Sequence, residues 1–228
     1  KKEENLDLYV TTYNILPISH EYGYIEFVPN STTLYSLREE SKFSIQNWII
    51  EKNHDININT LRDNISRSCA LYCIITYLLG IGDRHLDNIM ITDSGKLFHI
   101  DFGYILGQDP KLISPDIRLT PEMIDAMGGI NSKYYRNFKN YCGIAYNCMR
   151  RHAPIFYTML LDLIDFNPPI EQKNLTRESI KKHIIDRFIP GETYDNAINQ
   201  IKHKLDINSN TYSENIIDFF HKKCKSSN

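Results

Sequence analysis

The sequence predicts an α+β fold that is mostly helical. Three observations predict it: β-prone runs open the chain, a long apolar helix is followed by two short strands joined by a turn, and helical patterns fill the chain beyond residue 120. The chain has 228 residues, of which 42% are hydrophobic and 24% are charged, a balance typical of one globular domain or one large lobe. The net charge of -2 disfavours binding through bulk charge to nucleic acid, so we expect no nucleic-acid partner.

The first fifth of the chain predicts strands and one short helix. Residues 6–15 are rich in Leu, Val, Thr and Tyr, and residues 24–28 form a second β-prone run. The segment between them begins with Pro17 and ends with Gly23, and its composition is that of a turn. Residues 44–51 carry apolar side chains at helical spacing.

A buried helix and a polar loop come next. Residues 65–79 are apolar nearly all round, which is typical of a helix buried on every side. Gly80 and Gly82 favour the end of that helix, and a polar, charged loop follows over residues 83–88.

A β-hairpin is predicted directly after the loop. Residues 89–92 and 97–100 form its strands, and Asp93-Ser94-Gly95-Lys96 has the composition of its turn. Asp101-Phe102-Gly103 follows the second strand. Because the open ends of a hairpin lie side by side, residues just before and just after it can face one site.

The rest of the chain predicts helices. They cover residues 134–149, 155–166, 179–188, 194–205 and 212–223. The last one carries Phe219 and Phe220 on an apolar side, followed by Lys222 and Lys223. Such a helix can dock on a membrane surface, or it can pack against the lobe while its basic tail stays in water. The sequence leaves both alternatives open.

The cysteines indicate a reducing compartment. The five are Cys69, Cys73, Cys142, Cys148 and Cys224. None forms a CxxC pair, so reduced thiols in the core are favoured over a disulfide or a zinc site. No apolar run reaches the roughly 20 residues that a spanning helix needs, and no signal peptide opens the chain. We therefore expect a cytoplasmic protein that meets membranes only at their surface.

The loop and the hairpin carry a pattern that fits phosphoryl transfer. Asn88 and Asp101 stand at opposite ends of the hairpin and carry oxygens, the ligands that magnesium prefers. His85, just before, can take a proton from a hydroxyl. A lone histidine or a lone Asp-Phe-Gly is common by chance. The joint order of apolar helix, loop, hairpin and Asp-Phe-Gly is not.

These residues resemble a known family. Gly80-Ile81-Gly82-Asp83-Arg84-His85-Leu86-Asp87-Asn88-Ile89-Met90 resembles the catalytic loop of the phosphatidylinositol 3- and 4-kinase superfamily. Phe98-His99-Ile100-Asp101-Phe102-Gly103 is similar to that family's metal-binding motif. The resemblance implies that residues 1–31 are the last strands and hinge of a kinase N-lobe and that residues 32–228 are its C-lobe. The glycine-rich phosphate loop and the ATP-binding lysine strand do not occur before residue 26.

The resemblance also implies the roles of site residues. His85 is the expected general base, Asp83 orients the loop or shares that role, and Arg84 belongs to the same catalytic set. Asn88 and Asp101 are expected to bind Mg²⁺, or Mn²⁺ in its place. The backbone of Glu26 and Val28 would contact the adenine of ATP, with Met90 and Ile100 packed beneath the ring.

The segment after Asp-Phe-Gly predicts the substrate. It is expected to meet a lipid headgroup, and its basic residues are only Lys111 and Arg118. A headgroup with extra phosphates would need a denser cation cluster, so unphosphorylated phosphatidylinositol is favoured. Gly107-Gln108-Asp109-Pro110-Lys111 is similar to the Gly-Arg-Asp-Pro-Lys of class III, the vacuolar-sorting type of 3-kinase, with Gln108 in place of Arg.

The resemblance therefore implies phosphorylation of phosphatidylinositol at the 3-position. A 4-kinase, a related protein kinase and a non-catalytic binding module stay open as alternatives. It further implies a peripheral protein on endosomal or other internal membranes, a role in endosomal sorting or autophagy, and a regulatory subunit as a partner.

Overall fold

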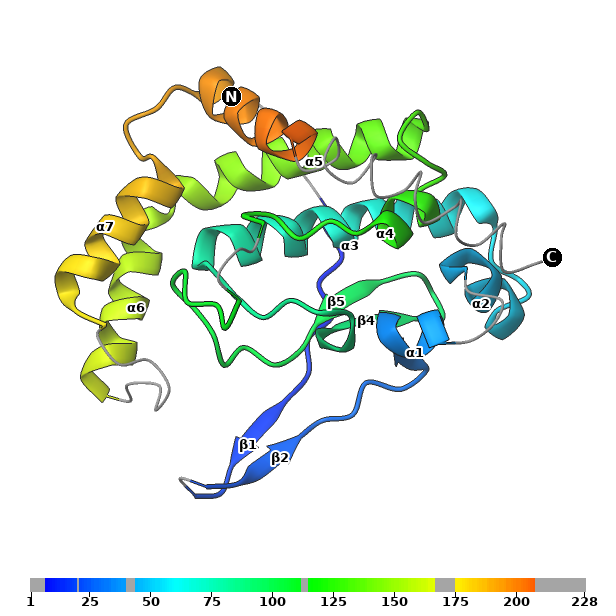
Figure 1. Cartoon of the computed structure of the whole chain (residues 1–228), viewed down its shortest axis with the longest axis horizontal. Helices are drawn as coiled ribbons and strands as arrows, with labels where there is room; N and C mark the ends of the chain where they lie inside the picture. The colour runs from blue at the N-terminus through cyan, green and yellow to red at the C-terminus, as the bar shows by residue number, and fades with distance from the viewer. Residues whose placement is uncertain (1–6, 20, 40–43, 112–114, 167–174, 208–228) are drawn as a thin grey trace.

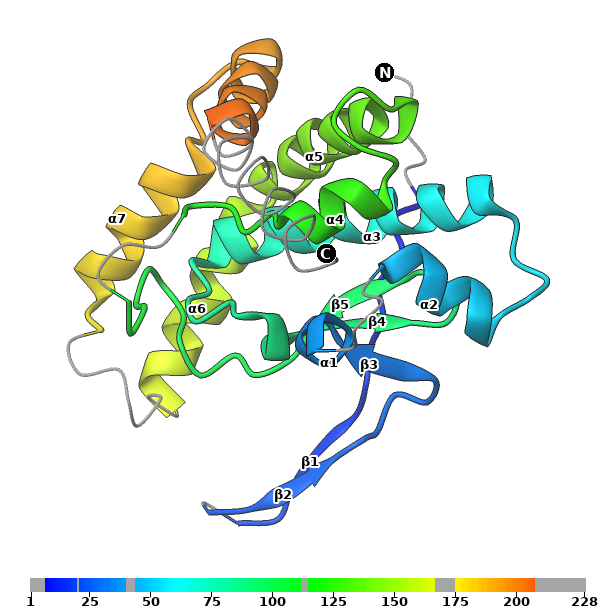
Figure 2. The ribbon, with the colours of Figure 1, turned by 45° about the vertical axis from the view of Figure 1, so that its right-hand side comes forward.

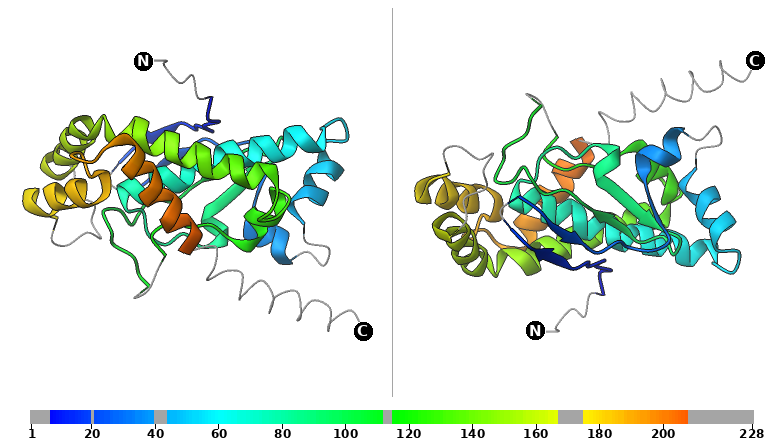
Figure 3. Two further views of the ribbon diagram at one scale, coloured as in Figure 1. Left: turned by 90° about the horizontal axis from the view of Figure 1, so that it is seen from above. Right: turned by 90° about the horizontal axis from the view of Figure 1, so that it is seen from below.

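The computed structural model describes residues 7–19, 21–39, 44–111, 115–166 and 175–207. The prediction of a mostly helical α+β fold is confirmed (Figure 1). A long central helix, α3 (Ile58–Leu79), lies between another long helix, α5 (Lys133–Arg150), and a small antiparallel sheet. Seen from above, α5 lies over α3 (Figure 3). This sandwich buries most of the apolar core and fixes the two ends of α3.

The central helix begins seven residues earlier than predicted. Its first turns carry polar residues, so the apolar pattern alone does not show them. The side chain of Asn57 accepts a hydrogen bond from the backbone N–H of Asn59 and caps the helix there. The helix ends as expected at Gly80, which takes a left-handed conformation with a φ of 58°.

The predicted hairpin is present. Strand β4 (Ile89–Thr92) pairs with β5 (Leu97–His99), with Ile89 opposite His99 and Ile91 opposite Leu97. The backbone N–H of Leu97 donates to Ser68 Oγ of α3 at 2.9 Å, which fixes the hairpin on the helix. A third strand, β3 (Ser31–Thr33), pairs with β4 and was not predicted, because its three polar residues give no β pattern.

The strand predicted over residues 6–15 is wrong for most of its length. Among the described residues before Ser31, β1 (Ile15–Pro17) and β2 (Gly23–Ile25) are the strands that pair, and they make a small hairpin that extends from the rest of the structure (Figure 1). Residues before β1 lie along α3 instead. Arg67 and Tyr72 of α3 donate to the carbonyls of Asp7 and Thr11 at 2.8 and 2.9 Å, so side chains satisfy this backbone.

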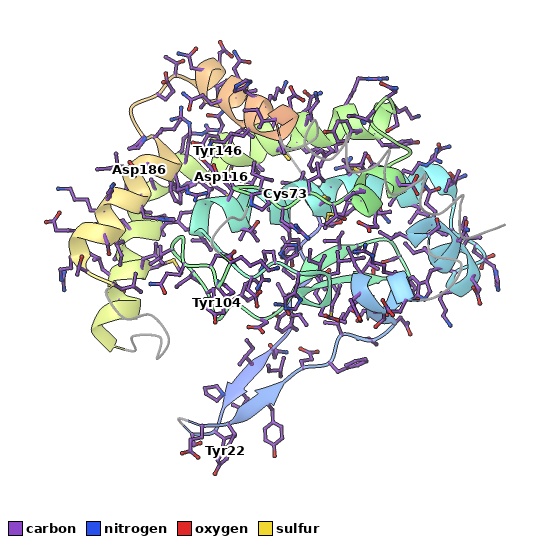
Figure 4. All side chains as sticks on the ribbon, viewed as in Figure 1. Tyr22, Cys73, Tyr104, Asp116, Tyr146 and Asp186 are labelled. Atoms are coloured by element: carbon purple, nitrogen blue, oxygen red, sulfur yellow. The ribbon has the colours of Figure 1, made fainter. Side chains whose placement is uncertain are left out.

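The β1–β2 hairpin exposes apolar side chains. Tyr24, Ile25 and Phe27 are each more than two-thirds exposed. Tyr22, at the tip, points away from the other elements (Figure 4). The division of the chain into an N-lobe part (residues 1–31) and a C-lobe (residues 32–228) stays a prediction.

The other predicted helices are present with shifted ends, and short helical elements appear that were not predicted. Confirmed are α2 (Ile45–Lys52), α5, α6 (Ala153–Phe166), α7 (Arg177–Phe188) and a helical segment over residues 194–207. Additional are α1 (Leu34–Glu39), the 3-10 turn η1 (Leu86–Asn88) and α4 (Pro121–Ala126). In Figure 2, α6 and α7 form one end of the molecule. The helix predicted over residues 212–223, with Phe219, Phe220, Lys222 and Lys223, lies outside the described residues.

The described cysteines are free thiols, as predicted. Cys69, Cys73 and Cys142 are buried and Cys148 is exposed. Burial raises the pKa of the Cys142 thiol well above its usual value, which keeps it protonated. Within the described part of the chain, no helix is both long and apolar enough to cross a membrane.

The buried His99 makes stability depend on pH. Its ring stacks on Tyr72 at 5.1 Å, and burial lowers its pKa from 6.5 to about 3. Between these two values the unfolded chain binds a proton that the folded chain does not. The free energy of unfolding should therefore fall as the pH drops below the unfolded value, by about 2 kcal/mol at pH 5.

Urea unfolding at pH 7 and pH 5 measures this loss. The substitution His99→Phe keeps an aromatic ring against Tyr72 but removes the titrating group, so its loss between the two pH values should be smaller by about 2 kcal/mol. Equal losses in both proteins would contradict the assignment of this pH dependence to His99.

Candidate active site

The loop after α3 brings three predicted residues together. Asp83 has a left-handed backbone with a φ of 52°. Its carbonyl accepts hydrogen bonds from the His85 N–H and from Asn88 Nδ2, both at 3.0 Å. Asp83 Oδ2 lies 3.5 Å from His85 Nε2. The predicted base, its orienting carboxylate and one predicted metal ligand thus form a single cluster.

His85 Nε2 has a partner in either protonation state. The Asn88 amide nitrogen lies 3.3 Å from it and can donate to an unprotonated Nε2. Once Nε2 has taken a proton, it can donate to the carboxylate of Asp83. A group that must accept and later release a proton is well served by a donor on one side and an acceptor on the other.

Arg84 holds the loop against the end of the hairpin. Its buried guanidinium donates to the carbonyls of Gly82 at 2.8 Å, of Ile100 at 2.7 Å and of Asp101. It also lies 5.5 Å from the centre of the Phe102 ring. Burial lowers the pKa of Arg84, while the carboxylates of Asp101 and Asp83 oppose that effect. These contacts describe a residue that positions the loop. Its place in the catalytic set stays a prediction.

Asn88 and Asp101 offer oxygens that fit a hard divalent ion. The Ile100 N–H donates to the Asn88 carbonyl at 3.2 Å, so the open end of the hairpin sets the two segments side by side. Asp101 has a left-handed φ of 57°, and its Oδ1 accepts a hydrogen bond from Gly103 N–H at 3.3 Å. Among the described residues, no hydrogen bond reaches Asn88 Oδ1 or Asp101 Oδ2.

The donor set indicates an ion that is shared with substrate. Across the described ranges there is no group of three or more His, Cys, Asp or Glu side chains that could hold a metal. Mg²⁺ fits this description, because it is commonly bound by one or two protein oxygens and completed by phosphates and water. The role of both residues as metal ligands is a prediction that this chemistry supports.

The predicted adenine-packing residues Met90 and Ile100 lie at the open end of the hairpin. Side chains alternate along a strand, so Met90 lies on the face opposite Ile89 and Ile91, while His99 of β5 stacks on Tyr72 of α3. Ile100 directly follows β5 and is joined to Asn88 by a backbone hydrogen bond. Met90 and Ile100 are half-buried. They can therefore form an apolar floor that begins next to the metal-binding oxygens.

The predicted hinge residues have free backbone groups. Glu26 N–H donates to the Asn14 carbonyl at 2.8 Å, and the Glu26 carboxylate accepts from Asn14 Nδ2 at 2.7 Å. Within the described structure no hydrogen bond is made by the Glu26 carbonyl or the Val28 N–H. This leaves one acceptor and one donor, which is what an adenine edge needs.

The segment after Asp-Phe-Gly, residues 104–118, is called the substrate segment here. Its first residues run along the catalytic loop: Gly82 N–H donates to the Tyr104 carbonyl at 2.9 Å and Gly107 N–H to the Gly80 carbonyl at 2.8 Å. A Cβ at Gly82 would lie 2.9 Å from Asp109 Cα and closer still to the Gln108 carbonyl oxygen. Sequence reasoning found these glycines as a helix stop and missed that they make room for the segment.

Lys111 and Arg118 line one cavity of about 90 Å³ under the substrate segment. Arg84, Asp109 and Asp116 line it as well. The two predicted substrate-binding cations are thus brought together, in the company of two carboxylates that sequence reasoning did not single out. Asp109 and Asp116 reach this cavity through contacts with distant parts of the chain, which a local sequence pattern does not reveal.

The far end of the substrate segment is anchored on the C-terminal helices. Asp116 Oδ1 lies 3.3 Å from Arg187 Nη2 of α7, and Asp116 Oδ2 lies 2.7 Å from Lys204 Nζ. Partial burial raises the pKa of Asp116, but the Lys204 hydrogen bond and the Arg187 charge outweigh it, and the net shift is downward. Arg187 also stacks on Tyr77 of α3, with its guanidinium carbon 4.7 Å from the ring centre.

The family model described as phosphatidylinositol 3- and 4-kinase matches residues 1–167. The chain belongs to this family. It is 38% identical to phosphatidylinositol 3-kinase pik3 of Schizosaccharomyces pombe over 96% of its length, and 44% identical to phosphatidylinositol 3-kinase VPS34 of Arabidopsis thaliana over 69%. The VPS34 of Saccharomyces cerevisiae is 41% identical over 69% of the chain.

These relatives confirm the predicted resemblance to the family and to its VPS34-type 3-kinases. The chain spans only 28% of the S. pombe relative, 20% of the Arabidopsis relative and 18% of the S. cerevisiae relative. The matched region covers the loop, the hairpin and the substrate segment described above.

The close approach at Gly82 predicts a large effect of one methyl group. Gly82→Ala should lower the free energy of unfolding by about 1–3 kcal/mol, because the added Cβ meets the backbone of residues 108 and 109. Gly191→Ala is the matched control, since a Cβ there meets nothing within 4 Å. Thermal unfolding of both variants tests this. A stable Gly82→Ala protein would show that the substrate segment does not pack on the catalytic loop.

Proposed function

We propose that this chain forms the C-lobe and the hinge of a phosphatidylinositol 3-kinase, with residues 1–31 as the end of the N-lobe and residues 32–228 as the C-lobe. The observation that carries the proposal is the cluster of Asp83, His85 and Asn88 beside Asp101, in a chain 38–44% identical to proteins named phosphatidylinositol 3-kinase. The reaction transfers the γ-phosphoryl group of ATP to the 3-hydroxyl of the inositol headgroup.

Each side chain of the site has its own role in this phosphoryl transfer. The 3-hydroxyl oxygen attacks the γ-phosphorus, the bond from that phosphorus to the β–γ bridging oxygen breaks, and ADP leaves. The hydroxyl proton passes to His85 Nε2, which the Asn88 amide and the Asp83 carboxylate flank on two sides. Asn88 and Asp101 would hold Mg²⁺ or Mn²⁺, which neutralises charge on the phosphates when bound. Met90 and Ile100 support the adenine, while Glu26 and Val28 contact its edge through their backbone groups.

The cavity under the substrate segment favours a headgroup without further phosphates. Lys111 and Arg118 supply its cations together with Arg84, but the guanidinium of Arg84 is engaged by three backbone carbonyls. Asp109 and Asp116 add negative charge to the same lining. Additional phosphates would meet repulsion there without new partners, which supports phosphatidylinositol itself as the substrate.

The place of action is proposed from the resemblance. A phosphatidylinositol kinase must reach its substrate in a membrane, and we propose a cytoplasmic protein held peripherally on endosomal or other internal membranes, in endosomal sorting or autophagy. Phe219, Phe220, Lys222 and Lys223 are the proposed membrane contacts. A regulatory subunit is a proposed partner. Lipid-vesicle flotation with and without residues 212–223 tests the membrane contact.

The first test is the reaction itself. The natural full-length polypeptide that contains these residues should label phosphatidylinositol from ATP in the presence of Mg²⁺, and chromatography should identify the 3-phosphate. Asp101→Ala should reduce the rate by about 100-fold or more, because the phosphates lose charge stabilisation. Asp55→Ala, at an exposed aspartate far from the loop, is the control.

The product decides between the alternatives. A 4-phosphate would replace the 3-kinase assignment with a 4-kinase. Labelling of peptides instead of lipid would indicate a protein kinase, and no labelling of either would leave a binding module.

Gln108 offers a test of headgroup recognition. It is half-buried, and it lines a second hollow with Asp116 and Arg187. Gln108→Arg should lower the KM for phosphatidylinositol vesicles about two- to fivefold at low salt, since it adds a cation beside the headgroup, and less at high salt. Gln200→Arg adds the same charge on an exposed helical face and should leave the KM unchanged.

A further inference from the structure

One carboxylate joins the substrate segment to the catalytic loop. Asp109 Oδ2 accepts a hydrogen bond from the backbone N–H of Asp83 at 3.0 Å. Asp109 Oδ1 accepts another from the backbone N–H of Lys111 at 2.8 Å. The two oxygens therefore bind one residue of each segment, and both contacts are to backbone, which cannot swing away as a side chain can.

Asp109 is packed closely against the catalytic loop. Gly82 lies directly against residues 108 and 109, and even a methyl group there would meet Asp109 Cα at 2.9 Å and Asp109 Cβ at 3.1 Å. At this separation, aspartate is the shortest side chain with two acceptor oxygens that can reach a backbone N–H on each side. Asparagine would supply only one acceptor.

The residue that Asp109 holds is the one that orients the base. Asp83 has a left-handed φ of 52°, a conformation uncommon for a residue with a side chain. The same residue presents its carbonyl to Asn88 and its carboxylate to His85. A change in the backbone of Asp83 would therefore move the partners of both side chains.

We propose that Asp109 is a positioning residue that locks the substrate segment to the catalytic loop, so that the headgroup held by Lys111 meets His85 at a fixed separation. This inference rests on the proposed function. In this role Asp109 contacts neither the 3-hydroxyl oxygen nor the γ-phosphorus. It connects the segment that recognises the lipid to the loop that orients the base.

Hydrogen exchange tests the lock without any need for activity. In the natural full-length polypeptide, Asp109→Ala should speed exchange in peptides covering residues 82–83 and 110–111 by about tenfold or more, and Asp109→Asn should have a smaller effect. Peptides of the β4–β5 hairpin should not change. Asp125→Ala, at an exposed aspartate of α4, is the matched control. Unchanged exchange at both segments, or faster exchange throughout, overturns the proposal.

Steady-state kinetics test whether the Asp109 contact matters for phosphorylation of the lipid. Asp109→Ala should raise the KM for phosphatidylinositol and lower kcat, so that kcat/KM falls by about tenfold to 100-fold, with Asp109→Asn between it and the wild type. The KM for ATP should change less than about twofold, because Met90, Ile100 and the hinge backbone make no contact with Asp109. A rise in the KM for ATP as large as the loss of lipid transfer, together with a lower melting temperature, would show a merely structural role and overturn the proposal. A wild-type protein without lipid transfer refutes the proposed function, while the exchange experiment still decides the lock.

Discussion

The buried guanidinium of Arg84 is the interaction on which the rest of the site depends. It binds carbonyls of the catalytic loop and of the residues after β5, two segments separated by the whole hairpin. A planar group with several fixed donors can satisfy carbonyls in different directions at once, which a lysine cannot. If one contact were lost, a buried carbonyl would be left without a partner, at a cost of about 1–3 kcal/mol. The general-base candidate and the metal-binding oxygens therefore keep their relative positions.

The surrounding fold provides the rigid support for this arrangement. The hairpin is fixed to α3 through Ser68 and through the stacking of His99 on Tyr72, and α3 ends at the left-handed Gly80 where the catalytic loop begins. The proposed base and the proposed metal ligands thus belong to short connections between well-packed elements. Loops of this kind can hold uncommon backbone conformations, such as those of Asp83 and Asp101, because their neighbours over-determine them.

Local sequence patterns predicted the loop and the hairpin, but they could not predict contacts between distant segments. The apolar run, the two glycines and the turn at residues 93–96 act within a few residues, so their consequences could be predicted. The strand expected over residues 6–15 failed because Arg67 and Tyr72 satisfy that backbone instead of a neighbouring strand. Asp109 and Asp116 escaped notice for the same reason, since their partners lie 26 residues away in one case and 71 to 88 residues away in the other.

These two aspartates give the substrate segment two anchors of different strength. Asp109 is bound to backbone N–H groups beside a glycine that permits close contact, whereas Asp116 is bound to the side chains of Arg187 and Lys204 and is about half exposed. An exposed ion pair is weakened by salt and by competing charges, whereas the contact of Asp109 with the Asp83 backbone is partly buried and lies against Gly82. The chain from Asp109 to Asp116 spans at most about 25 Å when extended. Arg187 and Lys204 therefore hold the far end of the segment through contacts that salt weakens, while Asp109 keeps the near end on the backbone of the catalytic loop.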